Sequence, residues 1–339
     1  MADETVPANL TLDLDQAECL ILKMVRKPDG TITWDAPFTH TPAAPDPTSD
    51  TPVLTTDVTI NESNGTWLRI FLPRRSVQSS SSVGAGKLPL VVYFHGGGFI
   101  ICSAATTEFH NFCATIAAEL PAMVVSVEYR LSPKHRLPAA YDDAVEALHW
   151  IRFTDDQWLK EHADFSNCFL MGSSAGGNMA YWAGLRVVEE DLSPLRIGGL
   201  ILHQPFFGGI GRSGSELRLM NDAVLPLWVT DLMWDQALPE GADRDHEFCN
   251  VTSGGGCHLL EQIGRLGWRV MVTGCSGDLL IDRQVEFAKV AEGKGVAVAK
   301  QFEEGGYHCA EVIEPSKGKV LLAALKNFVL PNSEGFAIV

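Results

Sequence analysis

Short runs of apolar residues, separated by amphipathic stretches, make up most of the chain after residue 87. The runs are rich in β-branched and aromatic side chains, as strands covered on both faces are. They lie at Leu88–Phe94, Met123–Tyr129, Cys168–Gly172, Gly199–His203 and Trp268–Thr273. Stretches with helical spacing lie at Phe109–Leu120, Tyr141–Phe153, Gly176–Glu189, Arg283–Lys294 and Lys317–Leu330. Because strands alternate with helices, the pattern predicts an α/β fold with a mainly parallel sheet and right-handed crossovers.

The hydrophobic pattern is different before residue 88 and again between residues 208 and 262. Leu54–Ile60 and Thr66–Leu72 alternate apolar and polar residues, as half-buried antiparallel strands do. An amphipathic stretch near the N-terminus, Ala17–Met24, predicts a short helix and is followed by proline-rich sequence. Residues 208–262 lack a clear strand, so we expect an inserted helical cap there. The predicted organisation is an N-terminal arm or cap segment over residues 1–50 and one main domain over 51–335 that carries the insertion.

Composition and charge narrow the class of protein. The chain has 339 residues, 46% of them hydrophobic, and a formal net charge of −16. This charge repels nucleic acid and anionic membrane surfaces and suits an uncharged or cationic small molecule. No apolar stretch reaches the roughly 18 residues of a membrane helix, and the N-terminus lacks a secretory pattern. We therefore expect a cytoplasmic protein without nucleic-acid or membrane partners, as a monomer or a weak homodimer.

The cysteines do not indicate metal chemistry. There are eight of them, scattered along the chain, and none is in C-x-x-C spacing. Zinc sites usually show such paired spacing. The sequence therefore predicts no metal site.

A Gly-x-Ser-x-Gly motif lies between a predicted strand and a predicted helix. It reads Gly172-Ser173-Ser174-Ala175-Gly176 and directly follows the apolar run that begins at Cys168. In this setting the motif is typical of a nucleophile elbow, a strained turn that projects the serine hydroxyl above the sheet. Only Ser174 has glycine on both sides at two residues' distance. A glycine- and serine-rich loop that matches by chance is the alternative, and the strand-before, helix-after context argues against it.

A second glycine-rich segment follows the strand Leu88–Phe94. It reads His95-Gly96-Gly97-Gly98-Phe99. Glycine lets the backbone approach a reacting carbonyl closely, and its N–H groups can stabilise an oxyanion. We expect Gly96 and Gly97, with the N–H of Ala175, to form an oxyanion hole, in which Gly98 could replace one of them. No Lys-Ser/Thr pair follows, so the segment is not a phosphate-binding loop, and we interpret His95 as structural.

A serine nucleophile needs a base, and the base needs an orienting acid. In the chain order Ser…Asp…His, His308 lies in the loop Gly305-Gly306-Tyr307-His308 near the end of the chain. Asp278 follows the predicted strand Trp268–Thr273, and Asp282 is the second candidate for the acid. Taken alone, His308 could be a surface-loop residue and Asp278 a helix cap. Their order relative to the two glycine motifs favours a Ser174–His308–Asp278 triad.

Several motifs together resemble the hormone-sensitive-lipase branch of the α/β hydrolases, and more closely the plant class I carboxylesterases. These motifs are His95–Phe99, Glu128–Pro133, Leu137–Ala140 and Gly172–Asn178. The resemblance implies an α/β-hydrolase fold with an eight-stranded, mainly parallel sheet, flanking helices and an N-terminal and inserted helical cap. It also implies hydrolysis of short-chain carboxylic esters without a cofactor. The triad carries over as Ser174, Asp278 and His308, and the oxyanion hole as Gly96, Gly97 and Ala175.

The sequence also departs from this family pattern. Ser173 stands where the family usually has Asp or Glu, Lys134 replaces an acidic residue, and the proline common after the acid is absent from Asp278-Leu279-Leu280. The same family contains gibberellin receptors, which bind hormone but have lost the base; His308 argues against this alternative. A subgroup of intramolecular transesterases acting on acyl glucosides shares the triad and stays open.

We therefore predict an ester hydrolase that acts through an acyl-enzyme on acetyl-like esters of small, apolar plant metabolites. Phe99, Ile100, Phe206 and Trp228 are the expected walls of the substrate pocket. The rate should fall on acidification as His308 becomes protonated, near the ordinary histidine pKa of about 6.5.

Overall fold

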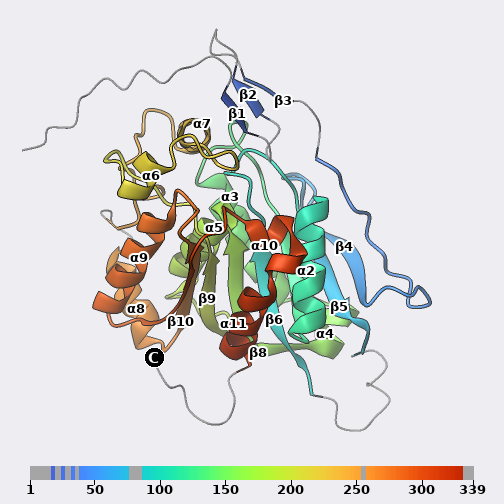
Figure 1. Cartoon of the computed structure of the whole chain (residues 1–339). Helices are drawn as coiled ribbons and strands as arrows, with labels where there is room; N and C mark the ends of the chain where they lie inside the picture. The colour runs from blue at the N-terminus through green and yellow to red at the C-terminus, as the bar shows by residue number, and fades with distance from the viewer. Residues whose placement is uncertain are drawn as a thin grey trace, which may run out of the picture.

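An eight-stranded sheet forms the centre of the structure, a computed structural model that describes residues 38–75, 86–252 and 257–330 and the backbone of residues 17–19, 24–26 and 32–34. Its strands are β4 (Val53–Asn61), β5 (Thr66–Pro73), β6 (Leu88–Phe94), β7 (Met123–Glu128), β8 (Ala163–Ser173), β9 (Ile197–His203), β10 (Arg269–Cys275) and β11 (Ala297–Glu303). They are ordered β11-β10-β9-β8-β6-β7-β5-β4 across the sheet (Figure 1). Neighbouring strands from β11 to β7 are parallel, whereas β5 is antiparallel to both β4 and β7. The expected mainly parallel eight-stranded sheet is confirmed.

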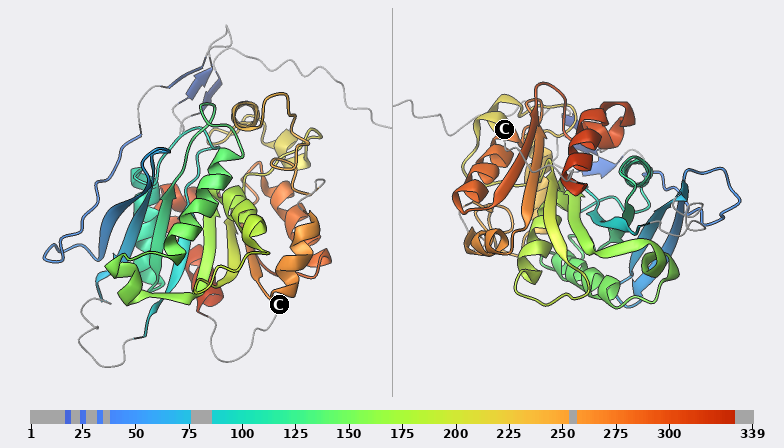
Figure 2. Two further views of the ribbon diagram at one scale, coloured as in Figure 1. Left: turned by 180° about the vertical axis from the view of Figure 1, so that it is seen from behind. Right: turned by 90° about the horizontal axis from the view of Figure 1, so that it is seen from below.

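Helices cover both faces of this sheet, because successive strand residues point to opposite faces. In β6, Val91 and Tyr93 pack on the side of α2 (Thr107–Glu119) and α11 (Lys319–Val329). Leu90, Val92 and Phe94 pack on the opposite side. That side is covered by α3 (Ala139–Arg152), α5 (Ala175–Val187) and α9 (Ile281–Gly293), as the reverse view in Figure 2 shows. The shorter helices are α4 (Gln157–His162), α10 (Ala310–Ile313) and the 3-10 turn η1 (Pro315–Lys317).

The edge strand β11 has no counterpart among the elements predicted from the sequence. It carries Lys300, Gln301 and Glu303, and none of its residues is fully buried. An edge strand pairs on one side only and needs no continuous apolar run, so its sequence lacks the signal that identified the inner strands.

The short helix expected at Ala17–Met24 is wrong. The structure has a small antiparallel sheet there, with β1 (Ala17–Cys19), β2 (Met24–Arg26) and β3 (Ile32–Trp34) in that order. An isolated helix of eight residues is marginal in water, because nucleation costs more than so few hydrogen bonds return. Pairing with β3, which is made of β-formers, satisfies the backbone of β2 instead. Figure 1 shows this sheet at the same end of the molecule as α6 and α7.

The insertion between β9 and β10 contains α6 (Gly214–Arg218), α7 (Leu227–Ala237) and α8 (Cys257–Arg265). In Figure 1, α6 and α7 lie beyond one end of the sheet, while α8 lies lower, near α9. This placement of α8 follows from the chain path, because α8 leads directly into β10 and also contacts α5. Among the described residues, no helix is long and apolar enough to cross a membrane.

Candidate active site

Ser174 stands at the carboxyl end of β8, where that strand turns into α5. Its backbone has φ 56° and ψ −120°, a region that a residue with a side chain rarely adopts. The turn is fixed by its neighbours: the Ser174 N–H donates to the His203 carbonyl at 2.9 Å, and the Ser174 carbonyl accepts from the Phe206 N–H at 2.9 Å. The strained conformation therefore belongs to a site that the surrounding backbone holds in place.

The two flanking glycines are required by close packing around this turn. A Cβ at Gly172 would lie 2.0 Å from the Gly176 carbonyl oxygen, and a Cβ at Gly176 would lie 1.9 Å from the Phe94 oxygen. No side chain fits at such distances. The glycine spacing that singled out Ser174 in the sequence thus has a steric cause.

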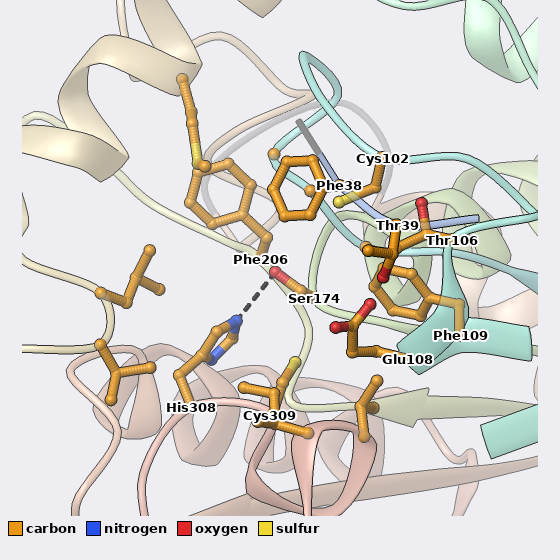
Figure 3. Close-up of a pocket in the computed structure, with 18 residues that line it drawn as sticks. Phe38, Thr39, Cys102, Thr106, Glu108, Phe109, Ser174, Phe206, His308 and Cys309 are labelled. Carbon is orange, nitrogen blue, oxygen red and sulfur yellow. Dashed lines mark hydrogen bonds between the residues drawn. The ribbon is translucent and has the colours of Figure 1, made fainter. Parts of the chain in front are cut away.

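The hydroxyl of Ser174 is the first member of a continuous hydrogen-bonded chain. Its Oγ lies 2.9 Å from His308 Nε2 (Figure 3), and His308 Nδ1 lies 2.8 Å from Asp278 Oδ2. Asp278 is fully buried and also accepts hydrogen bonds at 3.0 Å from the Leu280 N–H and the Gln284 side chain. The structure therefore brings together the three residues that the sequence predicted, 134 residues apart at the extremes.

The charge of Asp278 controls the protonation of His308. Burial alone would lower the pKa of His308, but the nearby carboxylate of Asp278 and its hydrogen bond raise that pKa well above the ordinary value. A histidine held in this way is a stronger base and has one fixed ring orientation. Such a base can take a proton from Ser174 Oγ.

The loop that carries His308 is shaped by unusual backbone conformations. Gly305 and Gly306 have φ of 76° and 72°, and Cys309 has φ of 56°. The Cys309 N–H donates to the side-chain oxygen of Gln204, which follows β9. This contact ties the base-bearing loop to the neighbouring strand.

Asp282, the second candidate for the acid, has a different partner. It lies in the first turn of α9, and its Oδ2 accepts a hydrogen bond from the Ser215 N–H at 2.7 Å. Ser215 belongs to α6, so Asp282 attaches the insertion to the main domain. No hydrogen bond joins Asp282 to His308 among the contacts of the described residues.

The glycine-rich segment lies against the nucleophile. A Cβ at Gly96 would be 3.0 Å from the Ser173 oxygen and 3.3 Å from Ser174 Cβ. Gly96, Gly97 and Gly98 all line the cavity that contains Ser174. Ala175, whose N–H was the third expected donor, is the first residue of α5 and is fully buried. The expected oxyanion-hole residues therefore surround the serine.

His95 has the environment of a structural residue. It is fully buried, its Nδ1 lies 2.7 Å from the Gly96 oxygen, and its ring stacks on Tyr129 with centroids 4.2 Å apart. Burial lowers the pKa of His95 to about 4. A neutral imidazole in this position fixes the start of the glycine segment.

Ser173, one of the departures identified in the sequence, is not among the residues that line the cavity. It is fully buried, and its Oγ accepts a hydrogen bond from the Tyr93 hydroxyl at 2.8 Å. A carboxylate at this position would have to share the same buried space. Lys134, the other departure that concerns charge, is exposed.

A cavity of about 310 Å³ opens on Ser174 and His308. Of the four expected substrate-wall residues, Phe206 lines it, while Phe99, Ile100 and Trp228 do not. Phe99 instead packs between Tyr141 and Trp234, with ring centroids 6.1 and 5.8 Å away. Trp228 is buried in the core on α7, and Ile100 packs against that core.

Most of the cavity wall comes from residues that sequence reasoning did not single out, although it expected a cap from the N-terminal arm and the insertion. They lie at the end of the arm, between β6 and the first turn of α2, in the insertion, and from Cys309 to the end of α10. Leu225 was recognisable as an apolar residue of the insertion. For the other wall residues, nothing in the local sequence distinguishes a side chain that lines a cavity from one that packs in the core. The residues concerned are Phe38, Thr39, Cys102, Thr106, Glu108, Phe109, Val224, Leu225, Met233, Cys309, Val312 and Ile313 (Figure 3).

Comparisons with known proteins show the family and the fold of this chain. The family model described as alpha/beta hydrolase fold matches residues 91–312. The chain is 55% identical to carboxylesterase 20 of Arabidopsis thaliana over 311 residues, which are 91% of this chain and 95% of that one. It is 47% identical to the 3-O-acetylpapaveroxine carboxylesterase CXE2 of Papaver somniferum over 283 residues, covering 81% and 90% of the two chains. Among solved structures, an esterase of Pyrobaculum calidifontis superposes with a TM-score of 0.67 at 23% identity, covering 81% and 84%, and shares the fold.

Proposed function

The chain belongs to the α/β-hydrolase family, within its plant carboxylesterase branch, and from this premise we propose that Ser174, His308 and Asp278 carry out its hydrolysis of carboxylic esters. The observation that supports these roles is the hydrogen-bonded chain from Ser174 Oγ through His308 to Asp278 at the wall of a cavity. A serine hydroxyl becomes nucleophilic when such a base is within hydrogen-bond reach.

The reaction proceeds in two half-reactions. Ser174 Oγ attacks the ester carbonyl while His308 Nε2 takes its proton, and the oxyanion is held by backbone N–H groups of Gly96, Gly97 and Ala175. The tetrahedral intermediate collapses, His308 gives its proton to the departing alcohol, and an acyl-enzyme remains. Water then attacks with the help of His308 and releases the acid and Ser174. Asp278 stabilises the imidazolium in both halves.

The proposed substrate is an acetyl-like ester of a small, largely apolar metabolite. The relative from Papaver somniferum is named for an acetyl ester, and the cavity here has a predominantly apolar wall that includes Phe109, Phe206 and Met233. We assign to a cap over this cavity the end of the N-terminal arm and the part of the insertion that carries α6 and α7. Phe38 from the arm and Val224 and Leu225 from the insertion support this assignment, because they lie on the cavity wall.

Hydrolysis of p-nitrophenyl acetate by the pure protein and its Ser174→Ala variant tests the proposal. The wild-type protein should hydrolyse the ester, and the variant should lose activity by at least about 10³-fold. A phosphonate label found by peptide mapping on Ser174 would identify the nucleophile independently. If Ser174→Ala hydrolyses the ester as fast as the wild-type protein does, Ser174 is not the nucleophile.

Transfer of the acyl group to another alcohol is the alternative reaction of the same triad. Incorporation of ¹⁸O from labelled water into the acid product measures hydrolysis, since transfer to an alcohol takes up no solvent oxygen. We expect label in the acid. Product esters without labelled acid would assign the protein to the transesterases instead.

A further inference from the structure

The cavity that opens on Ser174 contains a carboxylate without a function in ester hydrolysis. Glu108, in the first turn of α2, lines the cavity together with Ser174 and His308 (Figure 3). Its Oε2 atom is buried and has no hydrogen-bond partner among the described residues. Burying a charged oxygen without a partner costs free energy, so a partner supplied by a ligand would be favourable.

The remaining wall suits an alkylated cation. No Lys or Arg side chain is among the described residues that line the cavity, and the one histidine among them, His308, is bonded to Asp278 and Ser174 and not to Glu108. Three aromatic rings, of Phe38, Phe109 and Phe206, share the wall with it. Aromatic faces attract ammonium groups, and the formal charge of −16 on the whole chain raises the local concentration of cations. A neutral ligand would leave the charge of Glu108 uncompensated.

A purely structural explanation of Glu108 also exists. An acidic residue in the first helical turn interacts favourably with the N-terminal end of the helix dipole. This explanation predicts a contribution to the stability of α2 and no effect on which ester is preferred. The two explanations can therefore be separated by a substrate ratio.

We propose that Glu108 binds an ammonium group carried by the ester substrate, so that the cavity selects amine-bearing esters over neutral esters of the same shape. This inference rests on the proposed function and deepens it by naming a substrate class. Glu108 then acts through direct contact with the substrate and is a specificity residue, separate from the triad.

A pair of isosteric acetate esters measures this selection. Acetylcholine and 3,3-dimethylbutyl acetate differ by one quaternary nitrogen in place of a carbon. The ratio of their kcat/KM values within one protein cancels any general loss of activity. We expect wild type to prefer acetylcholine by about tenfold, Glu108→Gln to bring the ratio close to one, and Glu108→Asp to retain part of the preference. The matched control is Glu119→Gln, which removes the same charge from an exposed position on the same helix and should keep the wild-type ratio.

The outcomes separate this inference from the proposed function. If wild type hydrolyses both esters equally, or if Glu108→Gln keeps the preference, the inference is overturned while the hydrolase assignment stands. If wild type hydrolyses neither ester, calorimetric binding of choline and of 3,3-dimethylbutan-1-ol decides the role of Glu108 without turnover. Tighter binding of choline that is lost in Glu108→Gln supports the inference, and equal binding of both alcohols contradicts it. A melting curve checks that each variant is folded.

Discussion

Two adjacent serines show how position decides the chemistry of a side chain. Ser173 is the last residue of β8 and donates nothing to the cavity, because its hydroxyl is buried beside Tyr93. Ser174, one residue later, has φ of 56°, and this turn directs its hydroxyl to His308. The sequence distinguished the two only through the flanking glycines, and the structure gives the reason in the close contacts at Gly172 and Gly176.

The raised pKa of His308 predicts where activity is lost on acidification. The base must be neutral to accept a proton, so kcat/KM should rise with pH through the pKa of His308 in the free enzyme. Because Asp278 raises that pKa well above the ordinary value, the midpoint should lie above about 6.5, higher than the sequence alone suggested. Rates on p-nitrophenyl acetate between pH 5 and 9 measure it. A midpoint below 6.5, or a flat profile, would show that Asp278 does not act on His308 in this way.

Removing the charge of Asp278 should abolish most of the activity. In Asp278→Asn the imidazolium formed in the transition state loses its partner and the ring can adopt the wrong tautomer, so kcat should fall by about 10⁴-fold with little change in KM. Asp282→Asn is the matched control, since Asp282 was the competing candidate and bonds Ser215 instead. It should keep kcat within about tenfold of wild type. If Asp282→Asn lost activity and Asp278→Asn kept it, Asp282 would be the acid of the triad instead.

At the scale of elements, the inner strands and the antiparallel pair β4 and β5 were predictable, whereas the edge strand β11 and the N-terminal strands β1, β2 and β3 were not. Strands β6, β7, β9 and β10 are covered by helices on both faces, so most of their residues are apolar. The edge strand β11 is half-exposed and polar, and it carries no such signal. At Ala17–Met24 the spacing was helical, but antiparallel pairing between neighbouring segments, β1 with β2 and β2 with β3, produced strands instead. Local hydrophobic patterns indicate burial better than they indicate strand pairing.

The attachment of the insertion gives a prediction at this scale. Ser215 of α6 is joined to α9 by its hydrogen bond to Asp282, and a second contact joins Glu216 to Arg283. Asp282→Asn weakens the first and leaves the second, so the free energy of unfolding should fall by about 1–2 kcal/mol. Urea unfolding followed by fluorescence measures the loss. Glu62→Gln, an exposed change between β4 and β5, is the control and should have almost no effect. An unchanged unfolding midpoint for Asp282→Asn would mean that the contact contributes nothing to stability.

For the whole molecule, the triad was predictable from the order of the motifs along the chain, and the cavity wall was not. The carboxyl ends of parallel strands share one edge of a sheet, and the structure places Ser174 after β8, Asp278 after β10 and His308 after β11 at that edge. Which side chains face the cavity depends on how separate segments fold back over that edge. Phe99 and Trp228 have the size and apolarity of wall residues but pack into the core, while Phe38 reaches the cavity from the N-terminal arm.

A substitution at Phe38 therefore tests whether substrate recognition in the cavity depends on the N-terminal arm. Its ring is part of the wall, whereas Ser174 and His308 belong to the main domain, so Phe38→Ala should impair recognition of a large alcohol and leave the chemistry intact. We expect kcat/KM for 1-naphthyl acetate to fall about five- to tenfold and that for ethyl acetate to change less than about twofold, because only the larger group can reach the missing ring. Phe153→Ala, which truncates a phenylalanine that is 70% exposed, is the control and should alter neither value. Equal losses on both esters would mean that Phe38 supports the fold of the site and does not contact the substrate.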